Sequence, residues 1–173
     1  MADTAVTETP PRHRWLARFP EMGTEPIPVS RLTDPAYFEA ERQKIFKRCW
    51  LHVGRVEDIP EPGDWLVQEI AIAPASVLVV RGEDGVIRAF HNVCRHRGSK
   101  LAFGERGSGG GIFGCRFHGW SFDSQGTLIH VPQEENYYEP LCGKKNLLPV
   151  ACDTWQGFIF INLDPAPRES LAE

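Results

Sequence analysis

The sequence contains no run of apolar residues long enough to span a bilayer, so no membrane-crossing helix is expected. Its first eleven residues are polar and lack the apolar core of a secretory signal. Nor is there an excess of basic residues, because 23 Asp and Glu outweigh 19 Lys and Arg, for a formal net charge of −4. This balance offers no overall positive field for nucleic acid or an anionic membrane surface. We therefore expect a cytoplasmic protein with neither nucleic acid nor membrane as a partner.

The chain also lacks an even number of cysteines, since it has five. An odd number does not suit a framework of disulfides, in which every cysteine is paired. Reduced thiols or metal ligands are the better interpretation. Cys94 and Cys115 lie close to histidines, which suggests metal. Cys49, Cys142 and Cys152 lie beside apolar or aromatic residues, and we expect them to be buried structural thiols.

What the chain does contain is a hydrophobic fraction of 42% over 173 residues, enough for one folded domain with its own core. Residues 1–33 contain several prolines, between positions 10 and 28, and are expected to form an extended arm. A helical segment is expected over 34–50, with the helix itself from about 35 to 48. Asp34 suits the cap and Pro35 the first helical position.

After Trp50 the pattern changes to short strands separated by turns. We predict strands at Trp65–Ile70, Ser76–Arg81, Val86–Asn92, Trp120–Phe122, Thr127–Val131 and Phe158–Asn162. The close spacing of the turns predicts a mainly β domain over 51–165, an antiparallel sandwich or barrel. Residues 168–173 have the character of the beginning of a helix.

The central motif is Cys94-Arg95-His96, then eighteen residues, then Cys115-Arg116-Phe117-His118. Two thiolates and two imidazoles serve either zinc or a Rieske-type [2Fe–2S] cluster. Zinc fingers usually place two cysteines together and two histidines together, whereas here each loop supplies one of each. That pattern favours a two-iron cluster, in which one iron takes both cysteines and the other both histidines. The predicted ligands are therefore Cys94, His96, Cys115 and His118, inside an apolar shell of Phe113, Phe117, Trp120 and Phe122.

The segments Phe90-His91-Asn92-Val93-Cys94-Arg95-His96-Arg97-Gly98 and Cys115-Arg116-Phe117-His118-Gly119-Trp120-Ser121-Phe122-Asp123 resemble the Rieske domain of ring-hydroxylating oxygenase large (alpha) subunits. Gly126 and Leu128 extend the second motif, and the wider similarity covers about residues 34–165. The resemblance implies a Rieske-type β fold with two cluster-binding loops. It also implies that the four ligands divide between the two irons as above.

The same resemblance implies a role in oxygen-activating enzymes, dioxygenases or monooxygenases. Electrons would arrive from a reductase or ferredoxin and pass to a mononuclear iron in the catalytic domain of a neighbouring subunit, in a homotrimer or an alpha–beta hexamer. His118 would face that route.

This chain offers no candidate for the mononuclear iron site and no catalytic residue. Its other histidines are His13, His52, His91 and His130, and none has the paired spacing with a later carboxylate that such a site needs. We expect His91 to have a structural role and His130 to be partly exposed on a strand. Residues 166–173 would begin a linker to an absent catalytic domain. A free-standing Rieske ferredoxin and a zinc-stabilised binding module are the alternatives.

Within the Rieske class, the sequence predicts a low reduction potential. High-potential respiratory Rieske proteins carry an extra cysteine in each loop, joined as a disulfide, and neither loop has one here. Trp120 and Phe122 stand where those proteins would have a serine and a tyrosine that donate hydrogen bonds to sulfur. Fewer such bonds leave the reduced cluster less stabilised.

Basic residues gather around the motif: Arg95, Arg97, Lys100, Arg106 and Arg116, against Glu105. Two interpretations stay open from the sequence. This rim could steer an acidic electron donor, or its members could be solvated loop charges and ties to nearby groups.

Overall fold

The computed structural model describes residues 19, 21, 26 and 28–172. The chain divides into two compact units, Met1–Phe38 and Glu39–Glu173, and most of the first unit lies outside the described residues. The extended arm predicted for residues 1–33 therefore falls largely outside them as well. Where the arm is described, Ser30–Thr33 is not extended but forms the short helix α2. Within the described residues, no helix has the length and apolar character of a bilayer span.

The predicted helix is present with the start expected from its sequence. Helix α3 covers Pro35–Glu41, and the Asp34 carboxylate accepts a hydrogen bond from the Ala36 N–H at 2.8 Å. The helix then widens into a π-helical segment, η2, over Arg42–Phe46, two residues short of the predicted end. Within the second unit, Arg42 donates from Nε to the Ile72 carbonyl at 2.8 Å, which fixes this segment to the turn after β2.

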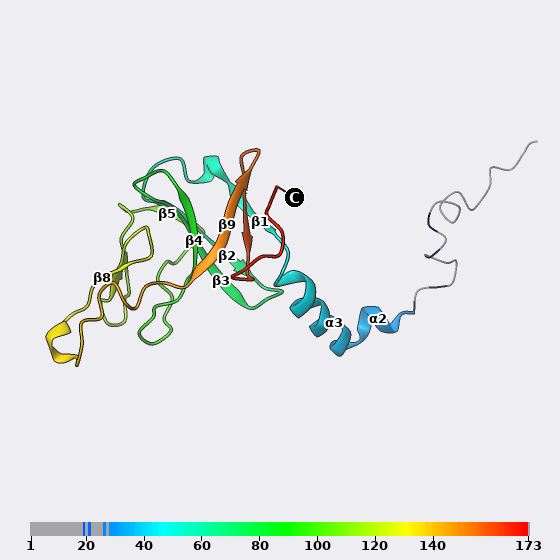
Figure 1. Cartoon of the computed structure of the whole chain (residues 1–173), viewed down its shortest axis with the longest axis horizontal. Coiled ribbons are helices and arrows are strands. Elements are labelled where there is room, and N and C mark those ends of the chain that lie inside the picture. The colour runs from blue at the N-terminus through cyan, green and yellow to red at the C-terminus, as the bar shows by residue number, and fades with distance from the viewer. Residues whose placement is uncertain (1–18, 20, 22–25, 27, 173) are drawn as a thin grey trace, which may run out of the picture. The chain divides into compact units, whose positions relative to one another are not determined.

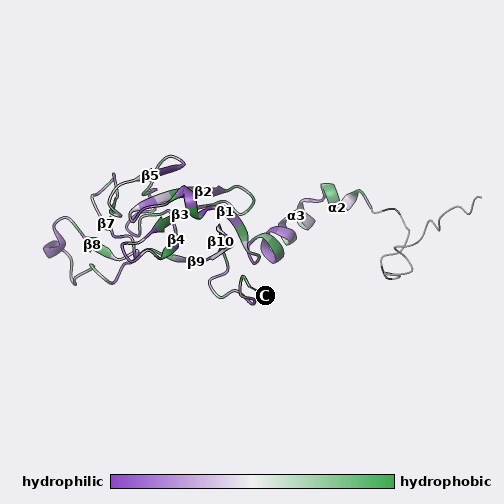
Figure 2. Ribbon diagram, turned by 90° about the horizontal axis from the view of Figure 1, so that it is seen from above, coloured by the Kyte–Doolittle hydropathy of each residue, from purple (hydrophilic) through white to green (hydrophobic). Residues whose placement is uncertain are grey.

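The larger sheet has seven strands in the order β1-β10-β9-β4-β3-β2-β5, all paired antiparallel (Figure 1). Its strands are β1 (Leu51–Arg55), β2 (Asp64–Ile70), β3 (Ala75–Arg81), β4 (Ile87–His91), β5 (Arg106–Ser108), β9 (Pro149–Trp155) and β10 (Phe158–Asn162). A smaller sheet of β6 (Phe113–Gly114), β7 (Ser121–Phe122) and β8 (Leu128–His130) lies at one end of it (Figures 1 and 2). The mainly β, antiparallel fold expected from the sequence is confirmed.

Strand β3 divides the core into two halves. Leu78 and Val80 pack into the half that also contains Cys94 and Cys115, whereas Val77 belongs to the half on the other face. These residues of β3 are fully buried, which explains why the middle of the strand, residues 77–80, is an apolar run. Figure 2 shows the hydropathy along the strand. The first half of the core therefore includes the two cysteines of the Cys/His loops.

Several predictions about local structure need correction. The sequence pattern does not predict strands β1, β5, β6 and β9. β9 begins at Pro149 and is mostly exposed or half-buried, so it lacks a clear alternating pattern, and a proline is tolerated as a first strand residue. The helix expected at 168–173 is wrong for the part that is described, since residues 168–172 form bends and a turn. So short a run supplies one helical turn at most, too little to offset nucleation.

Gly126 is required by packing as well as by backbone conformation. Its φ is +80°, and a Cβ there would overlap the Phe90 ring beneath the loops. We expect Gly126→Ala to lower the free energy of unfolding by about 3 kcal/mol, from left-handed strain plus overpacking. Gly85→Ala is the matched control, because Gly85 has a φ of +76° with open space around its Cβ position. Urea denaturation of both variants measures the difference, and equal losses would show that the Phe90 contact does not matter.

Candidate metal centre

The two loops that carry the Cys/His motif have the same backbone construction. In the first, the Cys94 N–H donates to the Ser99 carbonyl at 2.7 Å and the Gly98 N–H donates back to the Cys94 carbonyl at 3.0 Å. In the second, Cys115 donates to Trp120 at 2.8 Å and Gly119 donates to Cys115 at 2.9 Å. Each loop is thus closed across the same number of residues.

The glycine four residues after each cysteine makes this closure possible. Gly98 has a φ of +77° and Gly119 a φ of +73°, a left-handed conformation that costs little only for glycine. At Gly119 a Cβ would also press on the Pro132 ring. The two loops therefore present their cysteines and histidines from equivalent turns, although the histidine comes two residues after Cys94 and three after Cys115.

The side chains of Cys94 and Cys115 lie next to each other. Both are buried and free of disulfides, and they lie within hydrogen-bond reach of each other. Burial raises the pKa of the Cys94 thiol. Burial also opposes ionisation of Cys115, but hydrogen bonds from the N–H groups of Phe117 and His118, together with those of the Cys94 and Ser99 side chains, lower the pKa of that thiol. Backbone N–H groups directed at sulfur are what a metal-bound thiolate needs.

The two imidazole rings of the loops also lie next to each other. The ring centroids of His96 and His118 lie 4.6 Å apart at 71°. Nδ1 of His96 is buried and has no hydrogen-bond partner. Among the described residues, it is the only buried side-chain nitrogen or oxygen without a partner. Burial, and then the nearness of His118, lowers the pKa of His96, which favours the neutral, metal-binding form. A buried nitrogen without a partner is costly, so this atom fits an iron ligand.

Aromatic side chains hold the His96 ring from one side. The buried Trp120 indole stacks on His96 with centroids 4.8 Å apart and planes at 10°, and Tyr137 meets Trp120 edge-on at 6.4 Å. Phe113 and Phe122 are buried, as the predicted apolar shell requires. Phe117 is not: it is 60% exposed, and its ring lies against His118 at 3.9 Å between centroids.

Asn92 ties the first loop to the chain beyond it, a role that the sequence does not reveal. Its side chain is buried and donates to the Ala102 carbonyl at 2.9 Å and to Ser76 Oγ at 3.2 Å. Its carbonyl oxygen accepts from the N–H groups of Leu101 and Ala102 at 3.1 and 2.9 Å. The only sequence signal is an asparagine at the end of a strand, which is common in turns.

His91, His130 and the other three cysteines belong to neither Cys/His loop, and His13 lies outside the described residues. His91 is half-buried at the end of β4, and burial lowers its pKa, while His130 is exposed on β8. The expectation that the other three cysteines are buried structural thiols is not met in their burial: Cys49, Cys142 and Cys152 are half-buried. Cys152 comes closest to the expected burial, since burial raises the pKa of its thiol to about 12.

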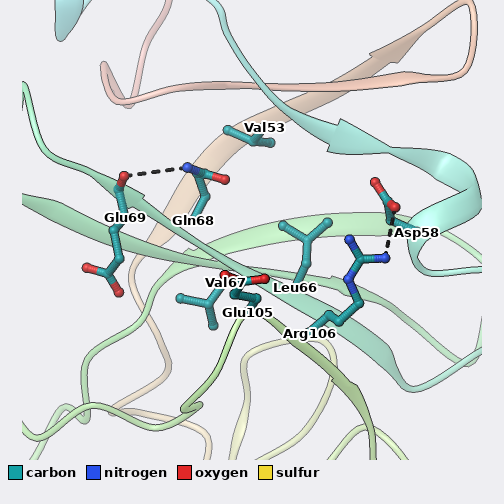
Figure 3. Close-up of a pocket in the computed structure, with 8 residues that line it drawn as sticks. All are labelled: Val53, Asp58, Leu66, Val67, Gln68, Glu69, Glu105 and Arg106. Atoms are coloured by element: carbon teal, nitrogen blue, oxygen red, sulfur yellow. Dashed lines mark hydrogen bonds and ion pairs between the residues drawn. The ribbon is translucent and has the colours of Figure 1, made fainter.

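Four of the five basic residues of the rim fall into two groups, and the fifth, Arg95, is exposed. Lys100 pairs with Glu69 at 2.7 Å and Arg106 with Asp58 at 3.1 Å. Figure 3 shows Arg106 turned toward Asp58 along a pocket beside β2. By contrast, Arg97 and Arg116 lie over aromatic rings, the first 5.6 Å from the centroid of Phe117 and the second 4.6 Å from that of Phe103.

Nowhere in the described part of the chain do three or more His, Cys, Asp or Glu side chains converge as the ligands of one metal ion would. A two-iron cluster makes a smaller demand, because each iron takes two protein ligands and the bridging sulfides complete its coordination. One pair of cysteines and one pair of histidines are consistent with two protein ligands for each iron.

Comparison with known proteins identifies the class. Residues 49–151 match the family described as "Rieske [2Fe-2S] domain". The chain belongs to this family, and membership implies a [2Fe–2S] cluster of the Rieske type.

Individual relatives are subunits of oxygenases. The chain is 37% identical over 139 residues to the carnitine monooxygenase oxygenase subunit of Escherichia coli K12, covering 80% of this chain and 36% of the relative. It is 39% identical over 134 residues to the biphenyl 2,3-dioxygenase alpha subunit of Rhodococcus jostii RHA1, covering 76% and 28%. The chain thus spans about a third of the length of these relatives. They favour the oxygenase interpretation over a free-standing ferredoxin.

Solved structures agree with the sequence relatives. A quaternary ammonium Rieske monooxygenase, described in terms of carnitine oxidation and inter-subunit electron transfer, matches with a TM-score of 0.76 and 27% identity over 82% of this chain and 38% of that one. Naphthalene 1,2-dioxygenase from Rhodococcus sp. matches with a TM-score of 0.76 and 34% identity, covering 84% and 33%.

Proposed function

We propose that Cys94 and Cys115 bind one iron of the [2Fe–2S] cluster and that His96 and His118 bind the other. The observation that carries this assignment is the buried, unpartnered Nδ1 of His96, whose ring lies 4.6 Å from that of His118. The two cysteines of the same loops are buried free thiols. When bound, the cluster accepts and releases one electron at a time. The chain positions the ligands through its two glycine-closed loops and excludes water with Phe113, Trp120 and Phe122.

We further propose that the whole protein is the large subunit of a Rieske oxygenase, as the carnitine monooxygenase and biphenyl dioxygenase relatives suggest. In it, 34–50 is a helical lead, 51–165 the electron-transfer domain and 166–173 the start of a linker. A reductase or ferredoxin would supply electrons, and a mononuclear iron in the catalytic domain of a neighbouring subunit, in a homotrimer or alpha–beta hexamer, would receive them. The free thiols suit a reducing, cytoplasmic compartment.

The loaded protein should have a low potential for a Rieske centre, about −150 mV, at the lower end of the class. The physical reason is that Trp120 and Phe122 lack the hydroxyl groups with which a serine and a tyrosine would donate hydrogen bonds to sulfur. Iron and sulfide analysis, the visible and electron paramagnetic resonance (EPR) spectra, and protein-film voltammetry test the assignment and the potential together. A colourless zinc protein would overturn the cluster assignment, and a potential near about +300 mV would overturn the account of its tuning.

Replacing one imidazole with a thiolate should lower the potential further. In His118→Cys a charged ligand replaces a neutral one, so the oxidised cluster is favoured. We expect a fall of about 100 mV or more, toward the all-cysteine clusters near about −400 mV. His130→Cys is the control, since His130 is exposed on β8 and belongs to neither Cys/His motif. An unchanged potential in a His118→Cys protein that still holds a cluster would remove His118 from the ligand set.

A further inference from the structure

We infer that the loop of residues 132–141 fixes the ring plane of His96. It does so through two aromatic contacts, from Tyr137 to Trp120 and from Trp120 to His96. The inference rests on the proposed function, because the plane of His96 matters here as that of an iron ligand. Tyr137 and Glu134, the residue that closes the loop, are positioning residues, since they act on His96 through other side chains.

The two aromatic contacts follow one another without a gap. The Tyr137 ring meets the Trp120 indole edge-on, with centroids 6.4 Å apart and planes at 72°. The indole is buried and stacks on the His96 ring, with centroids 4.8 Å apart and planes at 10°. An imidazole stacked in this way cannot turn without displacing the indole, and the indole cannot move without disturbing its contact with Tyr137.

The start of the 132–141 loop lies against the second Cys/His loop. A Cβ at Gly119 would approach Cγ of Pro132 to 2.9 Å, so the proline ring lies directly on that glycine. Gln133 follows with a φ of +54°, a left-handed conformation that is uncommon for a residue other than glycine. The chain therefore turns at once into the short helix η4 (Glu134–Asn136), drawn beyond β8 in Figure 1, and Tyr137 comes directly after it.

The Glu134 carboxylate closes the 132–141 loop. Its Oε1 accepts hydrogen bonds from the N–H groups of Leu141 and Cys142, at 2.6 and 2.7 Å. These bonds lower the pKa of Glu134, so the carboxylate stays ionised and the bonds are of the strong, charge-assisted kind. Leu141 is buried in the same half of the core as Trp120. Tyr137 thus lies between two anchored ends of the loop.

The ring plane of His96 matters because its buried Nδ1 has no partner within the protein. Stacking by Trp120 keeps that nitrogen directed inward and covers one face of the imidazole. The reduced cluster carries one more negative charge than the oxidised cluster, so water beside it stabilises the reduced form more. If the indole is held less firmly, water should reach this side and raise the reduction potential.

Tyr137→Ala is therefore expected to change the cluster without removing it. The potential should rise, the EPR g values should shift, and a chelator should remove iron about threefold to tenfold faster. That range corresponds to the loss of one edge-to-face aromatic contact. Tyr137→Phe keeps the ring and should restore all three properties. Protein-film voltammetry, the EPR spectrum of the reduced protein and the decay of visible absorbance measure them.

Tyr138→Ala is the matched control. It removes the same side chain from the next position, where the tyrosine is fully exposed, and should leave all three properties unchanged. Equal effects of the two alanine variants would overturn the inference. A lower urea midpoint for Tyr137→Ala with an unchanged potential and EPR spectrum would also overturn it, because the role of Tyr137 would then be stability alone.

A double-mutant cycle tests whether Glu134 acts through Tyr137. Glu134→Ala alone should speed iron loss, whereas Glu134→Ala/Tyr137→Ala should be no faster than Tyr137→Ala, since both changes release the same contact. Additive effects would overturn this step. A chain that binds no cluster contradicts the proposed function, whereas a cluster that Tyr137→Ala leaves unaltered contradicts only the inference.

Discussion

Cys115→Ala is expected to remove the cluster completely. The thiolate is one of two sulfur ligands that we assign to the same iron, and alanine offers no replacement. The loops should lose order with it, since cluster binding and folding of the binding loops are coupled. Iron and sulfide per chain should fall to background, with loss of the visible absorbance and the EPR signal of the reduced protein. Cys94→Ala should behave in the same way, because its loop has the same closure.

Cys142→Ala is the matched control for this loss. Cys142 is a half-buried free thiol that packs against the same half of the core as the two proposed ligands, so the substitution removes equivalent chemistry from the same neighbourhood. It should leave iron content and both spectra unchanged. The ligand assignment would be wrong if Cys115→Ala kept a Rieske spectrum, or if Cys142→Ala lost it.

The fold class is predictable because strand and turn signals act over a few residues. Runs such as Trp65–Ile70 and Ser76–Arg81, separated by turn residues, lie within a residue of strands β2 and β3. The unpredicted strands depend on partners far away in the chain. β5 covers only Arg106–Ser108 and pairs with β2, so its extended backbone is imposed by an edge that the sequence does not reveal.

The candidate site, like the fold, is predictable from the sequence only in part. The structure places the predicted ligands as two pairs, His96 beside His118 and Cys94 beside Cys115, on two loops with a common closure, and their role as ligands stays a prediction. The direction of each neighbouring side chain is beyond the reach of the sequence. Phe117 is predicted in the apolar shell and instead faces outward, since residues within a tight turn alternate in direction according to the local backbone. The division of the basic rim into paired and unpaired charges likewise depends on the positions of Glu69 and Asp58.

The two loops are alike in their closure but differ in the support of the chain beyond them. The second loop leads directly into β7 at Ser121 and is held there by the small sheet. The first loop leads into residues 99–105, which form bends and irregular chain before β5. That segment has no ladder of its own, so its backbone groups need another partner. The Asn92 side chain is that partner.

Asn92→Ala is therefore expected to be strongly destabilising. It would leave the N–H groups of Leu101 and Ala102 and the Ala102 carbonyl without their partner in a buried region. Each unsatisfied buried group costs about 1–3 kcal/mol, so a loss of about 4 kcal/mol is expected, a large share of the total for a domain. The urea midpoint of the cluster-loaded protein, followed by tryptophan fluorescence, measures it.

Two further variants separate this side chain's hydrogen bonds from its volume. Asn92→Asp keeps the volume and the two accepted bonds, but it turns a carboxylate oxygen toward the Ala102 carbonyl and buries a charge, so the loss at neutral pH should be at least as large as that of Asn92→Ala. Asn136→Ala, at an exposed position in the short helix η4 (Glu134–Asn136), should change stability by less than about 0.5 kcal/mol. If Asn92→Ala cost no more than Asn136→Ala, the segment after the first loop would have to be held by its apolar contacts. Faster cluster loss to a chelator in Asn92→Ala, with an unchanged potential beforehand, would show that Asn92 supports the loop and not the iron.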